Sequence, residues 1–208
     1  MTSQPARRYS GQSADERDAA RRQRLLAAAT DLIGRNGYAA TTVERICAEA
    51  KVSTRHFYLQ FDNKEAVFLA VYDDINSRSY QRATASLDAT QGKTLAERVP
   101  AAFLAYLGPM IEDIRAARIA FVEIVGASPR IEEVRLAYRE GLIELISAEG
   151  AAAVAKGEVA DRDFRFAALA LAGATNAIVY DWTLNSRKRP VEELEAALVE
   201  LAVTLLAG

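Results

Sequence analysis

The sequence predicts an all-α protein. Apolar residues recur with the spacing of a helix face through almost the whole chain, and no segment shows the apolar–polar alternation of a half-buried strand. Turn-forming residues separate these periodic segments, at Gly37, Gly108-Pro109, Ser128-Pro129, Gly157 and Pro190. Together the two patterns favour about nine helices and no sheet.

The first 64 residues predict a polar arm over 1–18 and short helices over 19–64. The arm contains Pro, Gly, Ser and Gln without any periodicity. The first helix is expected to end before Gly37, because glycine suits the left-handed position after a helix. Its apolar face consists of Leu25, Leu26, Ala29, Leu32 and Ile33. Two shorter helices follow, and a further helix over 63–79 leads into the remainder of the chain.

The remaining two thirds predict five longer helices, at about 94–107, 111–126, 131–155, 161–184 and 190–206. The helix over 161–184 is rich in Ala and Gly, which allow another helix to approach closely. The last helix carries a leucine stripe, formed by Leu194, Leu198, Leu201 and Leu205. Both features suit either the core of the chain or an interface between subunits.

Charge is distributed unevenly along the chain. Residues 1–64 contain 11 Lys and Arg against 7 Asp and Glu, whereas the remainder contains 15 against 21, for a net charge of −2. A basic first third on an acidic body suggests that the N-terminal end meets a polyanion. Chance variation in local composition would explain the same asymmetry. A sequence motif is therefore needed to distinguish a polyanion-binding end from chance.

Cysteine content and hydropathy point to the cytoplasm. The single cysteine, Cys47, cannot form an intrachain disulfide, which excludes a secreted disulfide scaffold. The N-terminus has no apolar stretch typical of a signal peptide. The most apolar segment, residues 166–180, is too short to span a bilayer. We therefore expect a cytoplasmic protein.

Residues 41–64 predict a helix-turn-helix. Two short helices joined by a turn at Ala50-Lys51-Val52 would leave the start of the second helix free to enter a major groove. That start reads Ser53-Thr54-Arg55-His56, which is polar and contains no carboxylate that would repel phosphate. Cys47, on the inner face of the first of these helices, is expected to be core rather than a redox sensor.

Residues 25–75 resemble the TetR family of bacterial transcriptional regulators. The resemblance is carried by Gly37-Tyr38, Thr41-Thr42-Val43, Ile46, Ala50, Val52-Ser53, Phe57-Tyr58, Phe61 and Lys64-Glu65. It implies a three-helix DNA-binding head over 19–64 and a ligand-binding and dimerisation domain over 65–208. Lys51 departs from the family pattern, which usually has glycine there.

The resemblance implies a role for each matching residue of the head. Thr42, Tyr58 and Lys64 match positions that contact phosphates, which fix register without reading sequence. The base-reading positions are those of Thr54, Arg55 and His56, preceded by Ser53 and followed by Gln60. An arginine such as Arg55 can bind guanine through two hydrogen bonds. Further backbone contacts are expected from Arg7 and Arg8, or from Arg21, Arg22 and Arg24.

The resemblance also implies an effector pocket and a homodimer in the body. The family binds hydrophobic small molecules among these helices, and the candidate lining residues are Phe103, Tyr106, Leu107, Phe121, Val125, Tyr138, Leu142, Phe166, Asn176 and Tyr180. The dimer would form through helices 161–184 and 190–206 and read a palindromic operator on double-stranded DNA. We expect a nucleoid-associated repressor that a small hydrophobic effector releases.

Two other functional classes compete with this interpretation. An all-α small-molecule-binding dimer without a transcriptional role would be expected to carry acidic or apolar residues at 53–60, and the polar run Thr54-Arg55-His56 speaks against it. An enzyme would need clustered catalytic groups, and one His and one Cys supply neither a catalytic set nor metal ligands. We therefore expect no catalytic residues, no metal and no cofactor.

Overall fold

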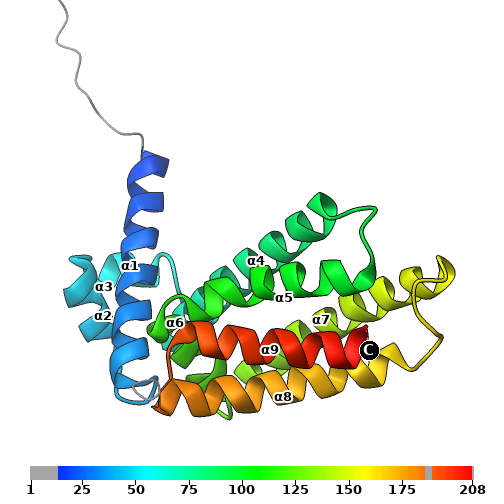
Figure 1. Ribbon diagram of the computed structural model, residues 1–208. Helices are drawn as coiled ribbons and strands as arrows, with labels where there is room; N and C mark the ends of the chain where they lie inside the picture. The colour runs from blue at the N-terminus through cyan, green and yellow to red at the C-terminus, as the bar shows by residue number, and fades with distance from the viewer. Residues whose placement is uncertain (1–13, 186–188, 208) are drawn as a thin grey trace, which may run out of the picture.

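The computed structural model describes residues 14–185 and 189–207. Within these ranges the chain forms nine α-helices and one π-helical turn, and contains no strand (Figure 1). The all-α prediction is therefore confirmed. The helices form a small head, which stands at one end of a larger helical body (Figure 1).

The head consists of helices α1 (Ala14–Asn36), α2 (Val43–Ala50) and α3 (Thr54–Tyr58). Helix α1 begins earlier than the sequence predicts, so residues 14–18 are helical rather than part of the arm, and Asp15 and Glu16 lie in the first turn. Residues 1–13, with Arg7 and Arg8, lie outside the described residues. The three helices share an apolar core that is inaccessible to solvent, formed by Leu25, Ile33, Ile46 and Phe57.

Side-chain caps fix where the two short helices begin. Thr42 caps α2 by accepting a hydrogen bond from the Arg45 amide, and Ser53 caps α3 by accepting one from the His56 amide. Between them Lys51 adopts φ 53° and ψ 45°, a left-handed conformation that no other non-glycine residue of the described chain adopts. The Lys51 amide donates to the Ala48 and Cys47 carbonyls at the end of α2. The turn is therefore hydrogen-bonded, although Lys51 adopts a costly conformation.

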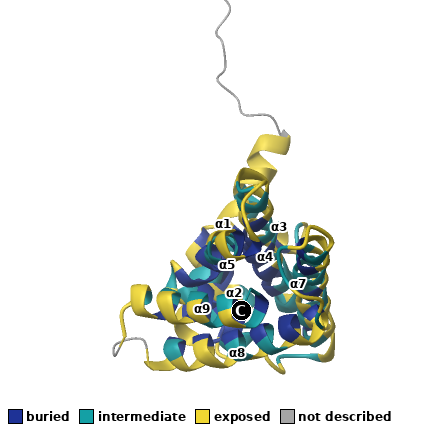
Figure 2. Cartoon of the chain, turned by 45° about the vertical axis from the view of Figure 1, so that its right-hand side comes forward, coloured by how far each residue is buried: buried dark blue, intermediate teal, exposed yellow. Residues whose placement is uncertain are grey.

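The body contains the other six α-helices. They are α4 (Lys64–Ala89), α5 (Leu95–Ile111), α6 (Ile114–Arg118), α7 (Pro129–Ala155), α8 (Phe164–Asn185) and α9 (Val191–Leu206). Helix α5 packs against α4 and α9, and α8 packs against α7 and α9. The buried residues face inward between these helices (Figure 2). No helix in the described part of the chain is long and apolar enough to cross a membrane.

The segment predicted as one helix over 111–126 is divided. Asp113 interrupts it, because the Asp113 carboxylate caps a new helix, α6, by accepting a hydrogen bond from the Arg115 amide. Helix α6 then continues into a π-helical turn, Ile119–Glu123. Such turns occur frequently at functional sites.

Replacing Lys51 by glycine should stabilise the protein. Glycine adopts the left-handed conformation without the steric cost that a Cβ incurs, so we expect Lys51→Gly to raise the free energy of unfolding by about 1 kcal/mol in urea titrations. Lys51→Ala is the matched control, since it removes the lysine side chain but keeps the Cβ. An equal gain in both variants would show that the conformation is not the cause.

Candidate nucleic-acid interface and ligand cavity

The start of helix α3 exposes polar side chains, while an apolar residue of the same helix is buried in the head. Phe57 is fully buried in the head, which fixes this five-residue helix, while Thr54 and Arg55 are exposed. The Ser53 hydroxyl and His56 Nδ1 lie 2.8 Å apart, so the two side chains hold each other beside the exposed pair. Within the described chain Arg55 makes no ion pair, and its guanidinium is available to a partner.

The other predicted contact residues surround this helix, but they differ in how exposed they are and in whether they already make bonds within the head. Thr42 and Tyr58 are exposed, and Gln60 is half-buried. Lys64 is engaged within the head: its Nζ donates to the Tyr38 carbonyl at 2.9 Å and lies 4.2 Å from the centroid of the Tyr38 ring. A phosphate would therefore have to compete with Tyr38 for this ammonium.

The basic residues of helix α1 are mostly engaged as well. Arg21 pairs with Asp18 at 2.5 Å, and the Arg22 guanidinium lies 4.5 Å from the centroid of the Phe61 ring. Exposed pairs of this kind contribute little to stability, so Arg21 can exchange its carboxylate for a phosphate at small cost.

Helix α1 of the head touches helix α6 of the body at Gly34. A Cβ on Gly34 would lie 2.4 Å from the Arg115 Cβ and 2.8 Å from its Cα, so the two backbones meet with no room for a methyl group. Arg115 Nη1 also donates to Asp31 at 2.7 Å, and Arg115 Nη2 pairs with Asp113 at 2.7 Å. The hydrogen bond from Arg115 lowers the pKa of the Asp31 carboxyl below its usual value.

Glu123, at the end of the π-helical turn, makes a second connection between head and body. Its carboxylate accepts a hydrogen bond from the Tyr38 amide at 2.7 Å and one from Arg118 Nε at 2.9 Å. Arg118 Nη1 donates to the Arg35 carbonyl at 3.1 Å, at the end of α1. The turn after α1 is therefore bonded directly to the body.

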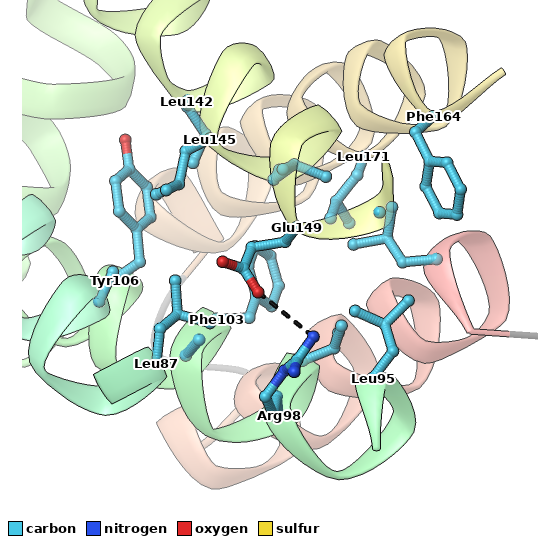
Figure 3. A pocket seen from close by; sticks show the side chains of 16 residues that line it. Leu87, Leu95, Arg98, Phe103, Tyr106, Leu142, Leu145, Glu149, Phe164 and Leu171 are labelled. Atoms are coloured by element: carbon cyan, nitrogen blue, oxygen red, sulfur yellow. Dashed lines mark ion pairs between the residues drawn. The ribbon is translucent and has the colours of Figure 1, made fainter. Parts of the chain in front are cut away.

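The body contains an apolar cavity lined by helices α4, α5, α7, α8 and α9 (Figure 3). Its apolar walls include Leu87, Leu95, Phe103, Leu145 and Phe164. The charged pair Arg98 and Glu149 breaks this apolar lining, and Figure 3 shows the contact between them.

A second, more polar cavity adjoins the first and lies nearer the head. The two share the lining residues Phe103, Tyr106, Leu142 and Leu171. Polar groups at the second cavity include Tyr72, Asn76, Arg135, Arg139 and Asn176. Burial raises the pKa of Tyr72 to about 12, so this hydroxyl remains a neutral donor.

The π-helical turn connects this second cavity to the head. Ala120 and Phe121 of the turn line the cavity, while Glu123 of the same turn bonds the Tyr38 amide. A ligand that displaces Phe121 would therefore move a residue only two positions from the head contact.

The structure brings together seven of the ten predicted pocket residues. Phe103, Tyr106 and Leu142 line both cavities, and the second cavity also contacts Leu107, Phe121, Tyr138 and Asn176. Val125, Phe166 and Tyr180 line neither, contrary to expectation, and are exposed. Val125 follows the π-helical turn, which shifts the helical register; Phe166 and Tyr180 lie on the outer face of α8.

Sequence reasoning missed the charged lining residues Arg98, Glu149, Arg135 and Arg139. Arg98 carried a signal, since it lies three residues after Leu95 and four before Ala102, on the apolar face of α5. Helix α7 carried none, because its charged residues surround it on several faces. Among the described residues no group of three His, Cys, Asp or Glu side chains could hold a metal ion.

Part of the head matches the model of a described family. Residues 25–71 match the family model of bacterial regulatory proteins, tetR family. Over 181 residues the chain is 21% identical to the fatty acid metabolism regulator protein of Bacillus subtilis (strain 168), covering 86% of this chain and 92% of that protein.

Solved structures share the fold over nearly the whole chain. The fatty acid degradation regulator FadR from Bacillus halodurans superposes with a TM-score of 0.79 at 20% identity, covering 90% of this chain and 95% of that one. The transcriptional regulator FadR from Bacillus subtilis, in complex with stearoyl-CoA, gives 0.77 at 21% identity, covering 89% and 98%. At these identities the similarity establishes the common fold.

Replacing Gly34 by alanine should loosen the contact between head and body. The methyl group would clash with the Arg115 backbone, so we expect Gly34→Ala to lower the free energy of unfolding by about 1–3 kcal/mol. In Gly141→Ala, the matched control, the added Cβ would meet only the Tyr80 hydroxyl, at 3.0 Å. A change below about 1 kcal/mol is expected there. Equal losses in chemical denaturation would refute the close approach at Gly34.

Proposed function

We propose that this chain, a member of the TetR family of bacterial regulatory proteins, is a cytoplasmic, nucleoid-associated repressor whose palindromic operator is released when the body binds an acyl-chain effector. The observation that carries the proposal is Arg55, which is exposed and makes no ion pair with any described residue. It lies on a short helix that the buried Phe57 anchors in the head. The roles proposed for the domains are DNA binding for 19–64 and effector binding with dimerisation for 65–208.

The DNA contacts divide into positioning and reading. Thr42, Tyr58 and Lys64 contact phosphates around the groove, and Lys64 exchanges its bond to the Tyr38 carbonyl for one to phosphate. Thr54, Arg55 and His56 read bases, with Arg55 donating to guanine O6 and N7. His56 and Ser53 keep the start of α3 ordered through their mutual contact, and Gln60 borders it.

The effector proposed is an amphiphile with a long acyl chain. The apolar cavity accommodates a hydrocarbon chain, and the adjoining polar cavity gives a second environment for polar groups. One structural relative is described in complex with stearoyl-CoA, and others are described as regulators of fatty acid metabolism or degradation. Those relatives support the acyl class for this chain.

Homodimerisation is proposed through helix α8, aided by α9. One face of α8 is exposed and mostly apolar or small, with the helical spacing of a packing stripe: Phe166, Leu169, Gly173, Ala177, Tyr180 and Leu184. An apolar stripe of this length is typical of a surface that a partner covers. In α9, Leu194 and Leu198 pack inside the chain, so only Leu201 and Leu205 of the predicted stripe are partly accessible.

The proposed release runs from the second cavity to the head through the π-helical turn. A ligand against Phe121 shifts this turn, and with it Glu123 and the close contact of α6 with α1. Helix α4 follows, because it begins in the head at Lys64 and lines both cavities further along. The effector must favour the state in which the two heads no longer fit their half-sites.

The DNA-binding proposal is tested by selection from a random pool of duplex DNA. Recovery of a single palindrome by the full-length protein at low salt is the expected result. Recovery of no enriched sequence from folded dimer would contradict the proposal. It would favour a small-molecule-binding dimer without a transcriptional role.

Replacing Arg55 by alanine should remove sequence discrimination. We expect Arg55→Ala to weaken binding to the selected duplex by about 1–3 kcal/mol, while binding to unrelated duplex falls much less. Arg130→Ala is the control, because Arg130 is also exposed but pairs with Glu133 in the body. Fluorescence anisotropy over a range of salt concentrations measures both. Equal losses on the two duplexes would make Arg55 a phosphate contact.

Charge on the exposed face of α8 should dissociate the dimer. The wild-type protein is expected at twice 22.7 kDa in light scattering, and Phe166→Glu with Leu184→Glu should give the monomer mass. Both side chains are exposed in one chain, at 70% and 55%, so the double variant should remain folded. Leu136→Glu is the matched control, because Leu136 is also exposed but lies on α7; this variant should stay dimeric. A wild-type monomer at micromolar concentration would overturn the dimer.

A further inference from the structure

Arg98 is a buried cation in the wall of an apolar cavity. Its side chain is 4% exposed, and the surrounding walls are contributed by residues such as Leu87, Leu95 and Phe103 (Figure 3). Taking a guanidinium out of water is costly unless its N–H groups are satisfied by an acceptor. The hydrogen bonds of Arg98 therefore show whether residues of the chain supply enough acceptors for its guanidinium.

The chain alone leaves the Arg98 guanidinium incompletely bonded. Nη1 makes a long bond of 3.4 Å to the Lys93 carbonyl. Nη2 lies 3.3 Å from Glu149 Oε2, but within the described chain neither Nη2 nor Nε has a hydrogen-bond partner of good geometry. Arg165, by contrast, holds Glu140 through two bonds of 2.6 and 3.1 Å. The donors of Arg98 are thus underused, although they are buried.

Glu149 is placed so that it can give way to another anion. Its side chain is 33% exposed, whereas Arg98 is enclosed. Both residues also border a surface groove, where Asp88, Gln91 and Lys156 lie. The pair therefore lies between the apolar cavity and this groove. When the Glu149 carboxylate turns into the groove it regains water, and the Arg98 donors face the cavity unopposed.

We propose that Arg98 is the carboxylate-binding residue of the effector cavity, and that the ligand is a long-chain fatty acid in its free form. The inference rests on the proposed function, because it specifies the acyl-chain effector named there. The ligand carboxylate replaces Glu149 on Arg98 and accepts hydrogen bonds from Nε and Nη2, in the planar two-point geometry that guanidinium favours. The hydrocarbon chain fills the apolar cavity towards Tyr106 and Leu142.

This arrangement predicts discrimination by head group. A methyl ester, an alcohol or a coenzyme A thioester of the same chain carries no carboxylate at this position, so it would leave a buried cation underused. The four compounds carry the same hydrocarbon chain, so only the head group differs at Arg98.

The test compares palmitate, hexadecanol, methyl palmitate and palmitoyl-CoA by calorimetric titration of the full-length protein, below the micellar concentration of each. Palmitate should bind more tightly than hexadecanol by about tenfold or more, because a charge-assisted pair is gained only with the acid. Glu149→Gln should strengthen palmitate binding severalfold, since it removes the competing carboxylate.

The double variant Arg98→Gln with Glu149→Gln removes both charges together, so it leaves no unpaired buried ion. Its preference for palmitate over hexadecanol should fall to near one. Arg78→Gln is the matched control and should keep the preference, because Arg78 is exposed and pairs with Asp74 on α4. Circular dichroism confirms that each variant is folded. Should the double variant fail to fold, the gain in Glu149→Gln still tests the proposal.

Four outcomes overturn the inference. They are equal binding of palmitate and hexadecanol by the wild type, a preference that survives the double variant, weaker palmitate binding by Glu149→Gln, and binding of palmitoyl-CoA without palmitate. The last of these leaves the proposed function standing with a thioester as effector. Binding of none of the four compounds would refute the acyl effector itself.

Discussion

The close approach of helix α1 to helix α6 at Gly34 is the constraint on which the rest of the molecule depends. A Cβ at Gly34 would lie 2.8 Å from the Arg115 Cα, so head and body meet backbone to backbone and cannot slide independently. The Asp31–Arg115 bond and the Tyr38–Glu123 bond flank this contact. Packed interfaces of this kind change between discrete arrangements rather than deforming continuously, which is what a switch requires.

The polar cavity lies next to this contact, and in the proposed mechanism that position couples the cavity to the head. Phe121 lines the polar cavity, and Glu123, in the same π-helical turn, bonds the head. A ligand therefore needs no long pathway of coupled residues to influence the head. The second route is α4, which is one continuous helix from Lys64 in the head to Ala89 beyond the apolar cavity.

The sequence predicted the head better than the body, for a physical reason. The turn around Lys51, the capping Ser53 and the buried Phe57 are local features, so a short stretch of sequence specifies them. The break at Asp113 depends on a hydrogen bond to the Arg115 amide, which helical periodicity alone does not reveal. The Arg98–Glu149 pair joins helices α5 and α7, and no spacing within either helix predicts that contact. Phe166 and Tyr180 lie outside both cavities, because helical periodicity does not distinguish an inner apolar face from an exposed one.

In the proposed mechanism, ligand binding by the body and DNA binding by the head oppose each other. This opposition is measured by the affinity for the acyl ligand, determined on the protein alone and on the protein saturated with its selected duplex. We expect DNA to weaken ligand binding by the same factor by which ligand weakens DNA binding, within the usual range of about 5–150-fold. Identical ligand affinities with and without DNA would contradict it, because a junction that transmits no free energy cannot connect the cavity to the operator.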